Sequence, residues 1–112
     1  RLTMLLAKTD RLQLPEESED RQHSWYLYTV RLKNATESER NKIVEVLRQK
    51  GIGAEVYYSN PVHLMPYYRD RFGGRRLPET EKAAKQVFSL PIHPSVTEAQ
   101  INYIGKTLLN LF

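Results

Sequence analysis

The sequence contains no cysteine, only five glycines and no long apolar run. The absence of cysteine excludes disulfides, thiol nucleophiles and thiolate zinc sites. No run approaches the roughly 20 apolar residues that a membrane-spanning helix needs. None of the three histidines has a carboxylate at a spacing typical of a metal site. The pair Gly73-Gly74 does not match a dinucleotide-binding or phosphate-binding loop.

What the sequence does contain is the composition of an ordinary globular domain. Of its 112 residues, 40% are hydrophobic and 27% are charged, which argues against a disordered chain. This length is sufficient for one domain with a modest core. The formal net charge of +4 is a small excess that ordinary enzymes also carry. Residues 1–7 lack the features of a signal peptide, so we expect a cytoplasmic protein.

The N-terminal part of the sequence predicts a helix, a connector and a strand. Leucine spacing favours a helix over residues 1–14, and because this helix begins without a cap we expect the chain to be part of a longer protein. Residues 15–20 are a polar, acidic connector. Residues 25–32 are rich in aromatic and β-branched side chains on both faces, which predicts a strand inside a sheet.

Two further helices are predicted from capping boxes, in which a threonine and a Glu or Gln three residues later satisfy each other's backbone amides. Thr36 and Glu39 begin a helix that should extend to about residue 50. Gly51 can then close this helix in the left-handed conformation. Thr97 and Gln100 begin the C-terminal helix.

The segment between these two helices completes the predicted fold. Residues 52–58 and 88–90 are short apolar strands, and Pro66 and Pro78 can each occupy the first position of a helix. The order of the elements predicts an α+β domain, with a small three-stranded sheet covered by helices.

Residues 57–68 are expected to form an ordered loop that binds a ligand. Its prolines and its Asn-Pro step disfavour regular secondary structure. Its four tyrosines and His63 are more typical of a binding surface than of a passive connector. Because Tyr57 and Tyr58 are adjacent at the end of a predicted strand, we expect them to face opposite sides, with Tyr58 packed and Tyr57 exposed.

Several short motifs, in a fixed order, resemble those of a known family. They are Ser24-Trp25-Tyr26-Leu27-Tyr28, Gly51-Ile52-Gly53, Tyr58 with Pro61-Val62-His63-Leu64, Pro66-Tyr67-Tyr68, Leu77-Pro78-Glu79-Thr80-Glu81 and Leu90-Pro91-Ile92. From about Leu12 to Phe112, the chain resembles the C-terminal small domain of pyridoxal-phosphate-dependent nucleotide-sugar aminotransferases of the DegT/StrS group. The resemblance implies the small-domain fold of fold-type I pyridoxal-phosphate enzymes. Residues 1–22 would then be the end of an interdomain helix and a connector, and residues 23–112 the small domain.

The resemblance also implies that this chain works with its own N-terminal large domain. In such proteins the large domain carries the cofactor lysine and most contacts to pyridoxal phosphate, and the whole enzyme is usually a homodimer. The parent protein would move an amino group, with glutamate the expected donor, to a keto-sugar nucleotide. This chain alone should be inactive and have no catalytic residue. Its seven lysines mostly fall on predicted helix faces or ends, where an amine is a poor Schiff-base nucleophile.

In the family, the loop after the second strand helps to close the cleft where the sugar nucleotide binds. Carried over to this sequence, substrate binding is assigned to Tyr57, Tyr58 and His63. Their hydroxyls and imidazole can bond to sugar and diphosphate oxygens, and their rings can stack on sugar or base. Tyr57, Ser59 and Met65 replace the His, Pro and Gln that are common at these positions, so the identity of the sugar stays open.

Other interpretations compete with this assignment. His63 can be a loop histidine bonded to a backbone carbonyl, and Glu79 and Glu81 are interpreted as first-turn acids of a helix rather than as a general acid and base. The chain can also be an interaction domain of an inactive homologue. A basic and aromatic cluster resembles a surface for single-stranded nucleic acid, a less favoured partner, or else a solvated helix and turn. Its basic residues are Arg69, Arg71, Arg75 and Arg76.

Overall fold

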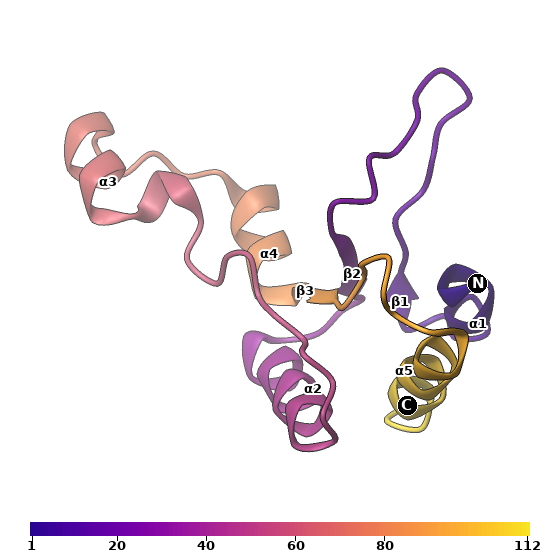
Figure 1. Cartoon of the computed structure of the whole chain (residues 1–112). Coiled ribbons are helices and arrows are strands. Elements are labelled where there is room, and N and C mark those ends of the chain that lie inside the picture. The colour runs from indigo at the N-terminus through magenta and orange to yellow at the C-terminus, as the bar shows by residue number, and fades with distance from the viewer.

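Residues 1–112 are all described by a computed structural model, in which five helices and one 3-10 helix accompany a three-stranded sheet (Figure 1). The helices are α1 (Leu2–Leu6), α2 (Glu37–Gln49), α3 (Pro66–Phe72), α4 (Pro78–Gln86) and α5 (Glu98–Leu109), and the 3-10 helix is η1 (Val62–Leu64). The strands are β1 (Leu12–Gln13), β2 (Tyr28–Leu32) and β3 (Val87–Leu90). None of the helices has the length and apolar character needed to cross a membrane. The predicted α+β class, with a small sheet and helices around it, is confirmed.

The sheet is antiparallel and has the order β1-β2-β3, so the predicted strand of residues 25–32 lies at its centre. In β2, the side chains of Tyr28, Val30 and Leu32 are buried on one face, while the residues between them are partly exposed. The strand begins at Tyr28 rather than Trp25, because Trp25 has a left-handed backbone with a φ of +51°. The prediction of an interior strand is therefore confirmed, with a shorter extent.

The hydrophobic core lies between this face of the sheet and two helices. Figure 1 shows α2 and α5 on the same side of the sheet. Val44 and Leu47 of α2 and Ile104 and Leu108 of α5 belong to one buried cluster with the inner face of β2. Helical spacings of three and four residues put these side chains on one face of each helix, as the sequence pattern predicts.

The N-terminal segment differs from its prediction. The helix ends at Leu6 instead of continuing to residue 14, and Leu12 lies in β1, where it pairs with Leu32. Leu2 and Leu6 are buried where α1 packs against α5. A side chain at Gly105 of α5 would lie 3.0 Å from Leu5, so the glycine permits this close approach. Pairing with β2 and packing on α5, which are both distant in sequence, decide the conformation of this segment.

Both predicted capping boxes are present. The Thr36 hydroxyl accepts a hydrogen bond from the Glu39 amide at 3.3 Å, and the Glu39 carboxylate accepts one from the Thr36 amide at 2.7 Å. Thr97 and Gln100 make the same reciprocal bonds at the start of α5. Gly51 follows α2 with a φ of +76°, as its position predicted.

The predicted strand over residues 52–58 is wrong. Only one isolated bridge forms there, between Glu55 and Ser89 of β3. Ile52 and Ala54 are buried, but beyond Glu55 the chain leaves the sheet and no side chain is buried again until Ala84. The third strand of the sheet is instead β1, which sequence reasoning assigned to a helix.

Arg40 connects α2 to the junction between α4 and β3. Its side chain is fully buried, an uncommon position for an arginine. One terminal nitrogen of its guanidinium group donates to the carbonyl oxygens of Ala84, at 3.0 Å, and Val87, at 2.7 Å. The Nε atom donates to Asn41 at 2.8 Å. Burial lowers the pKa of Arg40, and the carboxylate of Glu37 acts in the opposite direction.

We expect Arg40→Met to lower the free energy of unfolding of the chain by about 3 kcal/mol, because it leaves two carbonyl oxygens near the core without their donor. Urea denaturation measures this change. The control is Lys42→Met, since Lys42 is exposed on the same helix and its replacement should change stability by less than about 0.5 kcal/mol. Equal losses in the two variants would contradict the assigned role of Arg40.

Candidate functional site

The candidate site lies on residues 57–77, which we call the arm. Figure 1 shows the arm extending away from the sheet, with α3 at its far end. No side chain of the arm is buried. Seven aromatic or aliphatic side chains of the arm are between 41% and 64% exposed: Tyr57, Tyr58, Val62, Tyr67, Tyr68, Phe72 and Leu77. Apolar side chains gathered in this way on an exposed segment are typical of an interaction surface.

The short helix α3 forms where the sequence predicts it. Pro66 occupies its first turn, and Gly73 ends it with a φ of +71°, a conformation that glycine adopts without strain. The rings of Tyr68 and Phe72, one helical turn apart, are parallel within 11° at a centroid distance of 6.4 Å. The helix therefore presents two stacked rings on one of its sides.

These two rings line a groove of about 370 Å³ between α3, η1 and the start of α4. The groove is lined by Val62, His63, Tyr68, Phe72, Arg75, Leu77 and Thr80. Most of its surface is apolar, and it also contains an imidazole, a guanidinium group and a hydroxyl group. A surface of this kind can accept a ring or an aliphatic group together with an anionic or hydroxylated one.

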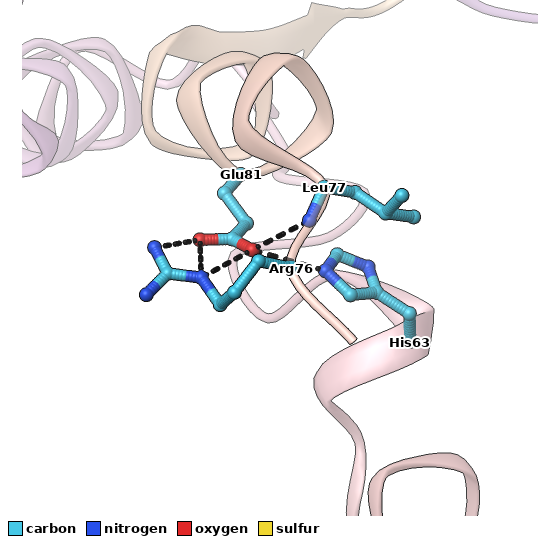
Figure 2. A network of polar contacts seen from close by, with 4 residues as sticks. All are labelled: His63, Arg76, Leu77 and Glu81. Atoms are coloured by element: carbon cyan, nitrogen blue, oxygen red, sulfur yellow. Dashed lines mark hydrogen bonds and ion pairs between the residues drawn. The ribbon is translucent and has the colours of Figure 1, made fainter. Parts of the chain in front are cut away.

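One carboxylate, that of Glu81, connects the arm to α4 (Figure 2). Its Oε2 atom lies 2.6 Å from a terminal nitrogen of Arg76. Its Oε1 atom accepts a hydrogen bond from the Leu77 amide at 3.0 Å and lies 3.3 Å from Nε2 of His63. We call these four residues the Glu81 network. The side chains of Glu81 and His63 are only 12% and 17% exposed.

The network fixes the charge state of Glu81. Its hydrogen bonds from Arg76, then from the Leu77 amide and His63, lower the pKa of Glu81 from 4.5 to about 2, although partial burial acts in the opposite direction. Near neutral pH this carboxylate is therefore ionised. Such a group can hold donors in place, but it is a poor general acid or base at that pH.

The structure places the predicted site residues in two groups. Tyr57 and Tyr58 are both exposed, and their rings meet edge to face at 5.6 Å. The expectation that Tyr58 is packed is wrong, because these residues are not in a strand. His63 lines the groove, which neither tyrosine does. The alternative in which His63 bonds to a backbone carbonyl is also wrong, since its partner is Glu81.

Two of the four arginines of the basic cluster, Arg69 and Arg76, pair with carboxylates of the chain. Arg69 bonds to Asp70 at 3.0 Å, and Arg71 bonds to the Tyr67 hydroxyl at 2.9 Å. Arg76 belongs to the Glu81 network. Arg75 is the one guanidinium group of this cluster with neither a hydrogen bond nor an ion pair, and it lines the groove. Two arginines without a carboxylate partner, Arg71 and Arg75, are a weak basis for a nucleic-acid surface, which needs several free cations along a strand.

Sequence reasoning missed the part that Glu81 plays. It identified Glu81 as an acidic residue in the first turn of a helix, which the structure confirms. A first-turn carboxylate can also reach back to the amide before the helix, as Glu81 does to Leu77. The available signal for the pair of Arg76 and Glu81 was their spacing, with Arg76 just before a proline-initiated helix and Glu81 in its first turn. The contact with His63 depends on the tertiary structure.

We expect Glu81 to titrate with a midpoint near 2 in the folded chain, and Arg76→Ala to move this midpoint toward 4.5. Carboxyl-carbon NMR measures this midpoint.

Because the pKa of Glu81 is lower in the folded state, the network stabilises the fold fully above pH 4.5, and this contribution is lost as the pH falls toward 2. In Glu81→Gln, the free energy of unfolding should change less with pH between 4.5 and 2. Glu79→Gln, which removes an exposed first-turn carboxylate with no partner, is the control. A midpoint near 4.5 in the unmodified chain would exclude the network.

Comparison with known proteins places the chain in a family. The sequence profile of the DegT/DnrJ/EryC1/StrS aminotransferase family matches residues 1–109. A protein of Geobacillus stearothermophilus named pleiotropic regulatory protein is 33% identical over 104 residues, which make up 92% of this chain and 27% of that protein.

Solved structures show the same fold. PseC of Helicobacter pylori, an aminotransferase involved in the biosynthesis of pseudoaminic acid, has a TM-score of 0.87 and 21% identity over 99% of this chain and 30% of its own. NtdA of Bacillus subtilis, solved with bound cofactor PMP, has a TM-score of 0.80 and 31% identity over 99% of this chain and 26% of its own. This chain thus spans less than a third of the length of these relatives. Since the family profile matches nearly all of its residues, the chain belongs to the DegT/DnrJ/EryC1/StrS aminotransferase family.

Proposed function

We propose that this chain is the C-terminal small domain of a pyridoxal-phosphate-dependent aminotransferase that acts on keto-sugar nucleotides, and that the arm lines its substrate cleft. The observation that carries this proposal is the arm itself, which presents exposed tyrosines and a groove on a segment without a core. Membership of an aminotransferase family supports the reaction class. The part of PseC in pseudoaminic acid biosynthesis supports a sugar substrate.

The residues of this chain do not form a pyridoxal phosphate site by themselves. A lysine that binds this cofactor as a Schiff base needs a desolvated or otherwise activating environment. All seven lysines are exposed: Lys8, Lys33, Lys42, Lys50, Lys82, Lys85 and Lys106. We therefore assign the cofactor to a large N-terminal domain outside this chain, joined through residues 1–22. We also propose that the whole enzyme is a homodimer. The PMP bound to NtdA supports this cofactor. When bound, it carries the amino group between the two substrates.

This chain contributes groups that hold the sugar nucleotide. The hydroxyls of Tyr57 and Tyr58 can donate to sugar or diphosphate oxygens, and their exposed rings can pack against a sugar face. His63 uses Nε2 toward Glu81, which leaves Nδ1 for the ligand. Arg75 has no partner within the chain and can pair with an anionic group at the groove.

The test of this proposal uses the full-length protein. We expect it to show the visible absorbance of bound pyridoxal phosphate and to transfer an amino group from glutamate to at least one keto-sugar nucleotide. A protein that transfers an amino group to none of a panel of keto-sugar nucleotides would contradict the proposed function.

The assignment of the tyrosines has its own test. Tyr57→Phe and Tyr58→Phe should each raise KM for the keto-sugar nucleotide by roughly fivefold to tenfold, because each removes a hydrogen bond to the substrate. KM for glutamate should stay unchanged. Tyr103→Phe is the matched control, since Tyr103 is an exposed tyrosine on α5 whose hydroxyl bonds to the Lys50 carbonyl instead. Unchanged KM values in both arm variants would remove these tyrosines from the site.

A further inference from the structure

We propose that Glu81 is the positioning residue of the arm: its carboxylate holds His63 and the end of the arm in the orientation in which the arm meets the sugar substrate. Glu81 itself does not touch the substrate. This inference rests on the proposed function and extends it to a residue outside the arm, on helix α4.

Apart from its contacts with Glu81, the arm has no polar side-chain anchor on the rest of the chain. None of its side chains is fully buried, and only Pro61, Leu64 and Met65 among its apolar residues are partly buried, so burial of apolar surface contributes little to fixing its position. At its N-terminal end, the chain is attached to β3 through the two backbone hydrogen bonds between Glu55 and Ser89, at 2.7 and 3.0 Å. From there to Leu77, every hydrogen bond that a side chain makes between the arm and the rest of the chain goes to Glu81.

Glu81 connects two separate parts of the arm. His63 lies in η1, within the first half of the arm, whereas Arg76 and Leu77 lie at its end. Both parts meet at the same carboxylate (Figure 2). The contacts to Glu81 therefore close the loop across α3 and hold the two sides of the groove together.

Glu81 lies on a helix that is itself held by the core, and its carboxylate is not free to bind a ligand. Helix α4 continues directly into β3, and its buried Ala84 accepts a hydrogen bond from Arg40. The carboxylate oxygens of Glu81 already accept bonds from three residues, and its side chain is only 12% exposed. Such a group acts through the residues that it holds, as a supporting residue behind a binding surface does.

The consequence is a selective effect on one of the two substrates. If the arm contacts the sugar nucleotide, loosening the arm weakens binding of that substrate. The amino donor is smaller and reacts at the cofactor, which we assign to residues outside this chain. The loss of the Glu81 network should thus change KM for the keto-sugar nucleotide and leave KM for glutamate unchanged.

The experiment compares Glu81→Gln with Glu79→Gln in the full-length enzyme. Glu81→Gln keeps the size of the side chain and removes its charge, and we expect KM for the keto-sugar nucleotide to rise about tenfold. KM for glutamate and kcat should change less than about twofold. Glu79→Gln removes an exposed neighbouring carboxylate without partners and should behave as the unmodified enzyme. Arg76→Ala, at a side chain that is 76% exposed, is the second variant and should change KM in the same direction.

Hydrogen exchange followed by mass spectrometry supplies a readout that a general loss of stability would not reproduce. In Glu81→Gln, peptides from residues 57–77 should exchange faster, while peptides from α2 should be unchanged.

The outcomes separate the inference from the proposed function. An inactive unmodified enzyme overturns the proposed function and the substrate part of the inference together. An active enzyme in which Glu81→Gln leaves both KM values and arm exchange unchanged overturns the inference alone. So does a variant in which both KM values rise together and exchange increases throughout the domain, because that pattern indicates a structural role.

Discussion

The central constraint on this structure is that no side chain between Ala54 and Ala84 is buried. Elements of a small domain are normally held by apolar burial, the dominant favourable term in folding. In the arm that term is small, so its position depends mainly on backbone geometry at its two ends and on the charged hydrogen bonds at Glu81. Segments of this kind belong to the least stable part of a protein, and binding surfaces are often found there.

A continuous set of contacts connects the core to the arm. The face formed by Tyr28, Val30 and Leu32 packs against α2 and α5. From α2, Arg40 reaches across to the carbonyls of Ala84 and Val87, where α4 passes into β3. The same helix carries Glu81 one turn from its start, so its C-terminal end is held by the core and its N-terminal end holds the arm. The buried arginine and the largely buried glutamate thus form one set of contacts from the core to the arm.

The sequence predicted the elements whose signals are local. The start of a helix is marked by interactions within a few residues, as for Thr36 with Glu39 and for the first-turn prolines of α3 and α4. These helices formed as expected. The failures involve partners distant in sequence. Leu12 became a strand residue because Leu32 lies opposite it, and residues 52–58 pair with β3 only at the bridge between Glu55 and Ser89. No local pattern shows either pairing. The same holds for the site: His63 was identified by its residue type, whereas its partner is reached only through the fold.

The distribution of charge in the arm bears on what the arm binds. Arg69 and Arg76 pair with carboxylates within the chain, and Arg71 bonds to the neutral hydroxyl of Tyr67. Arg75 is left without a partner, beside stacked rings and a hydroxyl in the groove. A surface meant for a long polyanion would leave most of these cations free, because affinity for nucleic acid rises with the number of phosphates neutralised. The single guanidinium group that lines the groove, next to rings, instead suits a ligand with one compact anionic group and a flat or apolar part. A sugar nucleotide, with its diphosphate between sugar and base, has that distribution of charge.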